Sequence, residues 1–215
     1  MLKNLLFSAA MLLPITALAA PVGVTLSPNK AITTYHGAPL RSTLPQWIPP
    51  TNAVAIINTF GPAHAYNCCS GWTISVPGGV GLQWIAYPIT PTAGAAGLRV
   101  VEAIGYVQGG DSVTIALLAD NGGVPGAVLS QKTKANLETF GQCCTVAVAD
   151  LDVPVTAGTT YWVGALLPRA SQSTTWDAWN FSTKAGIPTN TPFAYYNGSW
   201  NATTGSYAAF AVYGQ

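Results

Sequence analysis

The sequence predicts an all-β fold: an antiparallel, jelly-roll-like β-sandwich in a single domain. Beyond the first 20 residues, no segment spaces its apolar residues with the 3.6-residue period of a helix. Short β-branched and aromatic runs alternate with Gly, Pro and Asn, at spacings of about 8–12 residues that are typical of sandwiches and barrels. Val113, Ile115 and Leu117 share one face of their run, as the two-residue period of a strand requires.

Residues 1–19 have the pattern of a secretory signal peptide. Lys3 supplies the positive charge, and Leu5–Ile15 is an apolar stretch too short to span a bilayer. The Ala-Leu-Ala motif at 17–19 predicts cleavage after Ala19, with an uncleaved N-terminal anchor as the alternative. We therefore expect a secreted or periplasmic protein with no membrane span after signal cleavage.

Two further segments follow the signal. Residues 20–52 hold six prolines and little alternation, so we expect a Pro-rich arm or linker with one edge strand at Val22–Leu26. Residues 53–215 carry the strand-like runs and form the predicted β-sandwich domain. A mature chain of about 195 residues can bury a substantial core as one unit.

The predicted strands follow one another with turn residues between them. Asn197-Gly198 predicts a type I′ hairpin, since that turn needs positive φ at both central residues. The run from Asp120 to Gly126 predicts a compact turn between two strands. The expected strands are Val54–Thr59, Trp72–Val76, Leu82–Ile89, Leu98–Val107, Ser112–Ala119, Val128–Thr133, Cys144–Val153, Thr160–Leu167, Trp176–Ser182, Phe193–Tyr196 and Ala208–Tyr213.

The composition argues against two classes of protein. Only 7% of the residues are charged and the net charge is +1, so no basic face is available to neutralise the phosphates of a nucleic acid. With 49% apolar residues, seven Trp and nine Tyr, the chain has the means to build a core and is not expected to be disordered.

The four cysteines form two adjacent pairs, Cys68-Cys69 and Cys143-Cys144. An oxidising compartment favours disulfides, whereas zinc is disfavoured because vicinal pairs lack the usual C-x₂₋₄-C spacing. Three connectivities remain open: two vicinal rings, or either of two cross-pairings between the distant pairs. We favour cross-pairing, because a long closed loop constrains the unfolded chain most.

Four segments resemble a known family: Asn58-Thr-Phe-Gly-Pro62, Cys68-Cys69-Ser-Gly-Trp72, Asp120–Gly126 and Tyr161-Trp162. Together they resemble secreted bacterial β-sandwich domains of the "choice-of-anchor" type, over roughly Val54 to Gly214. The resemblance implies a jelly-roll-like sandwich and no established activity, and it supplies no catalytic residues. Members often carry a C-terminal sorting signal, which the sequence ending at Gln215 does not show.

No catalytic residue is predicted. The histidines, His36 and His64, lie in no metal-binding motif, and no nucleophile motif is present. A glycosidase would need two carboxylates about 5 to 9 Å apart, for which Glu102, Glu138 and Asp177 are the nominal candidates.

Sugar binding is better supported, because carbohydrate sites combine a flat aromatic face with amide and carboxylate groups. Residues 175–180 and 195–200 have this composition, although neighbouring aromatics such as Trp176 and Trp179 fall on opposite faces of a strand. The candidate ligand-binding residues are Trp176, Asp177, Tyr196, Asn197 and Trp200.

No cofactor is expected except a structural calcium ion. Asp120 and Asn121 offer oxygen ligands on a turn, which a hard cation prefers. The alternative is that Asp120 caps the backbone of its own turn.

These observations favour an exported, non-enzymatic β-sandwich that acts as a binding or matrix module, with glycans or cell-surface and matrix components as partners. The first alternative is a purely structural or interaction protein of the envelope or extracellular matrix. The second is a glycan-active enzyme.

Overall fold

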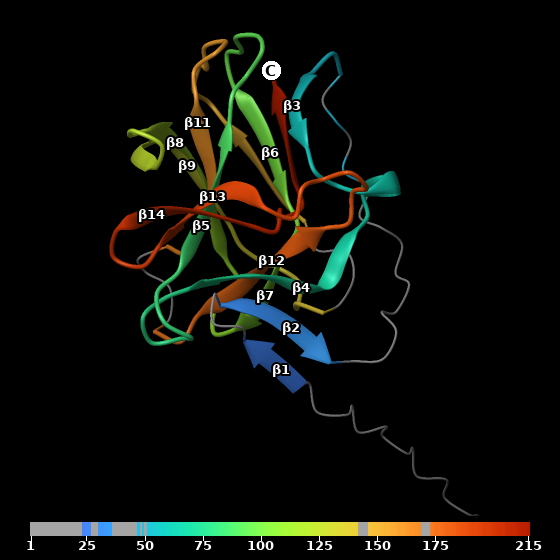
Figure 1. Cartoon of the computed structure of the whole chain (residues 1–215), viewed down its shortest axis with the longest axis vertical. Coiled ribbons are helices and arrows are strands. Elements are labelled where there is room, and N and C mark those ends of the chain that lie inside the picture. Colours follow the sequence, from blue (N-terminus) through green and yellow to red (C-terminus); the bar gives the residue numbers. More distant parts are fainter. Residues whose placement is uncertain are drawn as a thin grey trace, which may run out of the picture.

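The computed structural model describes residues 23–26, 30–35, 47, 49, 51–141, 146–168 and 173–215. Within these residues, the secondary structure comprises fifteen strands and one short 3₁₀ helix, η1 (Pro62–His64). The strands are β1 (Gly23–Leu26), β2 (Ala31–Tyr35), β3 (Val54–Asn58), β4 (Tyr66–Ser75), β5 (Trp84–Ile89), β6 (Leu98–Glu102), β7 (Ile104–Gln108), β8 (Val113–Asp120), β9 (Pro125–Lys134), β10 (Ala147–Leu151), β11 (Tyr161–Leu166), β12 (Trp176–Ser182), β13 (Thr191–Tyr196), β14 (Trp200–Gly205) and β15 (Phe210–Gly214). The predicted all-β, sandwich-like fold is confirmed (Figure 1).

The strands form three antiparallel sheets. The six-stranded sheet has the order β14-β13-β5-β11-β8-β9, the five-stranded sheet β1-β2-β4-β12-β7, and the four-stranded sheet β10-β6-β15-β3. Side chains from all three sheets meet in one buried core, with Ile85 and Ile115 from the first, Trp179 from the second and Phe210 from the third. The six-stranded sheet is therefore one layer of the sandwich, and the other two sheets form the opposite layer.

The two smaller sheets join at Ala103, which interrupts the strand predicted at Leu98–Val107. The Ala103 N–H donates to Ala209 O at 3.0 Å, and Ala103 O accepts from the Asn180 N–H at 2.8 Å. The Ala209 N–H in turn donates to Asn180 O at 2.7 Å. These bonds satisfy the backbone where one strand, divided into β6 and β7, passes from the four-stranded to the five-stranded sheet.

The buried side chain of Tyr87 connects the core to residues 206–208, which precede the last strand, β15. The Tyr87 hydroxyl accepts from Trp72 Nε1 at 2.8 Å and from the Ala208 N–H at 3.0 Å. It donates to Ser206 O at 2.7 Å. Because all the hydrogen-bonding capacity of the hydroxyl is used, this polar group is buried without leaving an unsatisfied donor or acceptor.

The N-terminal segment differs from the extended arm that its prolines suggested. β1 falls within the expected edge strand at Val22–Leu26, but β2 was not expected, and the two form a hairpin that adds to β4. Trp47, only 7% exposed, packs with Phe60 and Tyr213 on the outer face of the four-stranded sheet. These parts of residues 20–52 are therefore integrated into the sandwich.

β3 is an edge strand of the four-stranded sheet, and β14 is an edge strand of the six-stranded sheet (Figure 1). No helix among the described residues has the length and apolar character needed to cross a bilayer.

Candidate functional site

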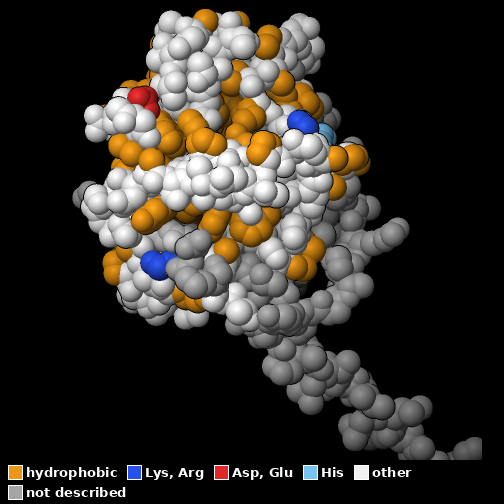
Figure 2. Space-filling view, in the orientation of Figure 1, with side chains coloured by type: hydrophobic (Ala, Val, Ile, Leu, Met, Phe, Trp, Pro, Cys, Tyr) orange, Lys and Arg blue, Asp and Glu red, His pale blue; other side chains and the backbone are white. Residues whose placement is uncertain are grey.

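A cavity of about 330 Å³ opens between the β13–β14 edge of the six-stranded sheet and the residue that precedes β2. In Figure 1, β13 and β14 cross the front of the molecule above β2 and β4. Figure 2 shows hydrophobic side chains on both sides of the band that these strands make, and few charged groups on this face. The cavity is lined by Lys30, Gln83, Ile85, Phe193, Tyr195, Asn197, Thr203 and Thr204.

Strand alternation decides which side chains reach this cavity. Phe193 and Tyr195 lie on the inner face of β13. The residues that alternate with them, Ala194 and Tyr196, point to the outer face. Phe193 stacks on Trp72, with ring centroids 4.8 Å apart, and forms the apolar base of the cavity. Tyr195 stays half-buried above it, which leaves part of an aromatic ring open to a ligand.

Gly205 makes this base possible. A Cβ atom at position 205 would lie 2.8 Å from Phe193 Cε1 and 3.0 Å from Trp72 Cζ2, closer than side-chain carbons pack. The glycine therefore allows β14 to run directly over the two stacked rings.

The polar rim comes from the hairpin between β13 and β14. The predicted hairpin is present, but its turn contains three residues, 197–199, and only Gly198 has positive φ, at 119°. A type I′ turn is thus not formed, because Asn197 keeps an ordinary backbone conformation. Asn197 Oδ1 accepts from Asn201 Nδ2 at 3.1 Å, which fixes the amide at the cavity mouth.

Lys30 and Gln83 form the opposite wall and are linked through Thr73. Gln83 Nε2 donates to Thr73 O at 2.9 Å, and Thr73 Oγ1 donates to Lys30 O at 2.6 Å. Lys30 Nζ donates to Leu82 O at 2.9 Å. Partial burial lowers the pKa of the Lys30 amine below its ordinary value.

The five candidates predicted from sequence divide into three groups. Asn197 lines the cavity. Tyr196 and Trp200 lie together on the outer face of the same hairpin, with Tyr196 stacked on Trp84 at 4.5 Å between ring centroids. The structure therefore places Tyr195, which the prediction passed over, on the cavity side and Tyr196 on the other.

Trp176 and Asp177 lie on a different sheet and do not belong to this site. Trp176 is 6% exposed and packs with Phe140, and its Nε1 lies 3.3 Å from Gln108 Oε1. Asp177 has no solvent exposure, and burial raises the pKa of its carboxyl well above the ordinary value, with a smaller contribution from Asp111. The binding role predicted for both is corrected, because a ligand cannot reach side chains buried in this way.

The three acids named for a glycosidase do not share a cleft either. Glu102, like Asp177, is fully buried, and burial raises its pKa well above the ordinary value. Glu138 is exposed. Asp177 pairs with Tyr106 of β7 in the five-stranded sheet, whereas Glu102 ends β6 in the four-stranded sheet.

The Asp120 side chain caps the backbone of its own turn, which is the alternative to calcium given above, and it also binds Trp162. Asp120 Oδ1 accepts from Trp162 Nε1 at 2.8 Å, and Oδ2 accepts from the Gly123 N–H at 3.2 Å. Asn121 closes the turn through its N–H to Val124 O at 2.8 Å. Among the described residues, no three His, Cys, Asp or Glu side chains are grouped as metal ligands. Calcium at Asp120 and Asn121 stays a prediction.

The structure does not test the cysteine prediction. Cys68 is buried and Cys69 half-buried, with their Sγ atoms 3.0 Å apart in a segment of β4 where the register with β12 jumps from Gly71 to Asn67. Cys143 and Cys144 lie outside the described residues. The cross-link between the two pairs therefore stays a prediction.

No protein-family model matches the chain, and the curated proteins include no significant relative. The resemblance to "choice-of-anchor" domains therefore stays a resemblance carried by the four segments named above.

Proposed function

We propose that the protein is an exported, non-enzymatic glycan-binding module whose site is the cavity beneath the β13–β14 hairpin. The observation that carries the proposal is the make-up of this cavity: the aromatic ring of Tyr195 above an apolar base, facing amide and hydroxyl groups of Asn197, Thr203 and Gln83. Sugars present one apolar ring face and a rim of hydroxyls, so they are bound by aromatic rings together with hydrogen-bonding groups.

The size and position of the cavity agree with this class of ligand. A volume of about 330 Å³ is at the lower end of the range for small-molecule sites, which suits one end of a sugar chain. The exposed hairpin residues leave room for further sugar units to extend into solvent. The signal-like N-terminus predicts export to a compartment where free and surface glycans are found, which supports the proposal.

A glycan array followed by titration calorimetry tests the proposal on the purified mature protein. Tyr195→Ala removes the aromatic ring of the cavity, and we expect it to weaken binding by about tenfold or more. Tyr196→Ala is the matched control, since it removes the adjacent tyrosine from the opposite face of the same strand. We expect the control to bind as the wild type does.

An equal loss in both variants would place the site elsewhere, and an array without any bound glycan would contradict the function itself. In the second case an interaction protein becomes the better candidate. One observation favours it: edge strand β3 has no charged residue, and its Val54 is 55% exposed. Uncharged open edges can pair with a strand of another chain.

A further inference from the structure

The cavity carries a positive charge that no acidic residue neutralises. Among the described residues that line it, Lys30 is the one with a charged side chain. All seven acidic residues of the chain lie in the described part, and none of them lines the cavity.

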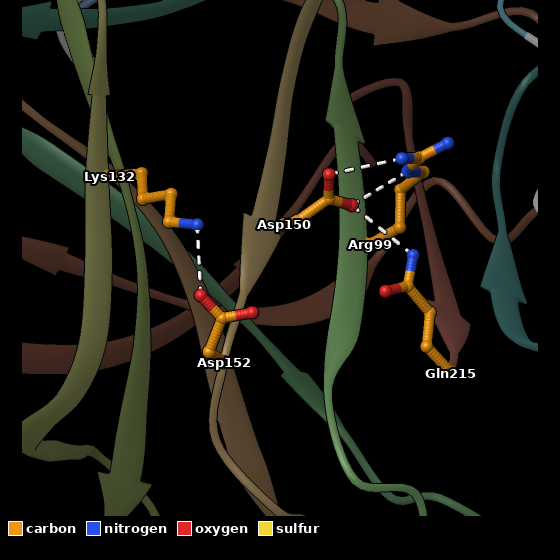
Figure 3. A network of polar contacts seen from close by, with 5 residues as sticks. All are labelled: Arg99, Lys132, Asp150, Asp152 and Gln215. Carbon is orange, nitrogen blue, oxygen red and sulfur yellow. Dashed lines mark hydrogen bonds and ion pairs between the residues drawn. The ribbon is translucent and has the colours of Figure 1, made fainter.

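Two other cations show the arrangement that Lys30 lacks. Arg99 holds Asp150 through two bonds, at 2.7 and 3.0 Å, and Lys132 lies 3.1 Å from Asp152 (Figure 3). Both of these charges are neutralised within the protein. Among the described residues, the acceptor for Lys30 Nζ is a neutral carbonyl, that of Leu82. A lysine ammonium has three N–H groups, so two remain for a ligand.

Lys30 is also held in place before any ligand arrives. Its backbone has a positive φ of 53°, and its carbonyl accepts both the N–H and the hydroxyl of Thr73. Its ammonium approaches the backbone at Gly81, where a Cβ atom would lie 3.0 Å from Nζ. A long side chain that is fixed in this way loses little additional freedom when it binds.

We propose that the cavity selects an acidic sugar residue, one that carries a carboxylate or a sulfate group, through Lys30. This inference rests on the proposed function, because it names the class of glycan that the same site binds. The sugar ring packs on Tyr195, its hydroxyls reach Asn197 and Thr203, and its anionic group accepts from Lys30 Nζ. A charge-assisted hydrogen bond is about twice as strong as a neutral one, which makes the anionic group the main source of selectivity.

Calorimetry with matched probes tests this on the mature protein. The probes are trisaccharides of galactose, glucose and mannose, their galacturonic, glucuronic and mannuronic acid counterparts, and 6-sulfated galactose. We expect the wild type to bind at least one acidic member about tenfold or more tightly than its neutral counterpart, with affinity falling between 50 and 500 mM salt. The carboxylated and sulfated arms identify which anion is preferred.

Lys30→Met should remove the preference and the salt dependence while leaving weaker, equal binding of both members of a pair. Lys184→Met is the matched control, since Lys184 also donates to a backbone carbonyl, that of Asn58, away from the cavity. Melting curves establish that both variants are folded. Equal affinities within every pair, or a preference that survives in folded Lys30→Met, overturn the inference while the glycan-binding function stands. Absence of binding to every probe and to the whole array overturns both.

Discussion

Glu102 and Asp177 are carboxylic acids without solvent exposure, and neither has a hydrogen-bond partner among the described residues. An ionised carboxylate in this environment is costly, which is why burial raises the pKa of both groups well above their ordinary values. These two buried acids are exceptions to the rule that acidic side chains lie at the surface or have a partner when buried. Their alternation with core residues is visible in the sequence, but the absence of partners depends on the assembled sheets.

The first prediction concerns the pH dependence of stability. A carboxyl whose pKa is raised on folding stabilises the native state fully below its unfolded pKa, about 4.5, and that contribution is lost as pH rises through the native pKa. Glu102→Gln should remove one such group, so its unfolding free energy should fall less steeply with pH. The difference in slope is about 1.4 kcal/mol per pH unit in that interval.

Urea unfolding of both proteins from pH 4 to pH 8 measures this slope. Asp177 remains in the variant and keeps part of the pH dependence, which provides an internal reference. Identical slopes in the two proteins would mean that Glu102 is ionised in the folded state.

The second prediction concerns calcium at Asp120 and Asn121. An ion that binds only the native turn stabilises it by mass action, so excess chelator should lower the melting temperature and added calcium should restore it. Asp120→Asn is the comparison: its one amide oxygen can keep the bond from Trp162 Nε1, while the bond from the Gly123 N–H and the charge that a hard cation prefers are lost. A melting curve unchanged by chelator would remove calcium from the account.

At the scale of elements, the sequence located most strands, and the misses have physical reasons. The strands expected at Ser112–Ala119 and Trp176–Ser182 correspond closely to β8 and β12. β14 was missed because its residues, Trp-Asn-Ala-Thr-Thr-Gly, are mostly polar and lie at an open edge. The cavity could not be foreseen, since it is formed where β14 meets Lys30, residues that are distant in sequence.

Alternation did predict that Tyr195 and Tyr196 face opposite ways. It could not show which of them faces the interior, because that depends on how the sheets stack. Lys30 was passed over for a different reason: it lies in the Pro-rich segment that we assigned to an arm, and no pattern there indicates contact with β4 and β5.

The third prediction concerns the cysteines and the elements that they would connect. We expect Cys68 or Cys69 to be linked to Cys143 or Cys144. Val146 packs against the same outer cluster as Cys68 and Cys69, two residues along the chain from Cys144. The closed loop of about 75 residues would stabilise the fold by about 4 to 5 kcal/mol in the loop-entropy model.

Peptide mapping without reductant decides between the connectivities. The prediction requires one peptide pair that contains both cysteine segments and separates only after reduction. Independent migration of the two segments before reduction would indicate vicinal rings, and the long-loop stabilisation would then be absent.

At the scale of the whole molecule, the protein is a β-sandwich with few charged residues and a positively charged cavity beside edge strand β14. Its all-β architecture followed from composition and periodicity, because both are properties of the chain itself. Its place outside the cytoplasm is a prediction from the N-terminus alone. Mass spectrometry of the exported protein tests it: we expect a mature chain that begins at Ala20, and a chain that retains Met1 would contradict export by this signal.

The most direct test of the central claim is to locate a bound glycan by NMR. The ¹⁵N-labelled mature protein is titrated with the tightest-binding glycan found on the array, and the amide signals are followed. We predict concerted shifts at Lys30, Tyr195, Asn197 and Thr203, which surround the cavity. Shifts confined to Trp84 and Trp200 on the outer face, with the cavity signals unmoved, would contradict the account.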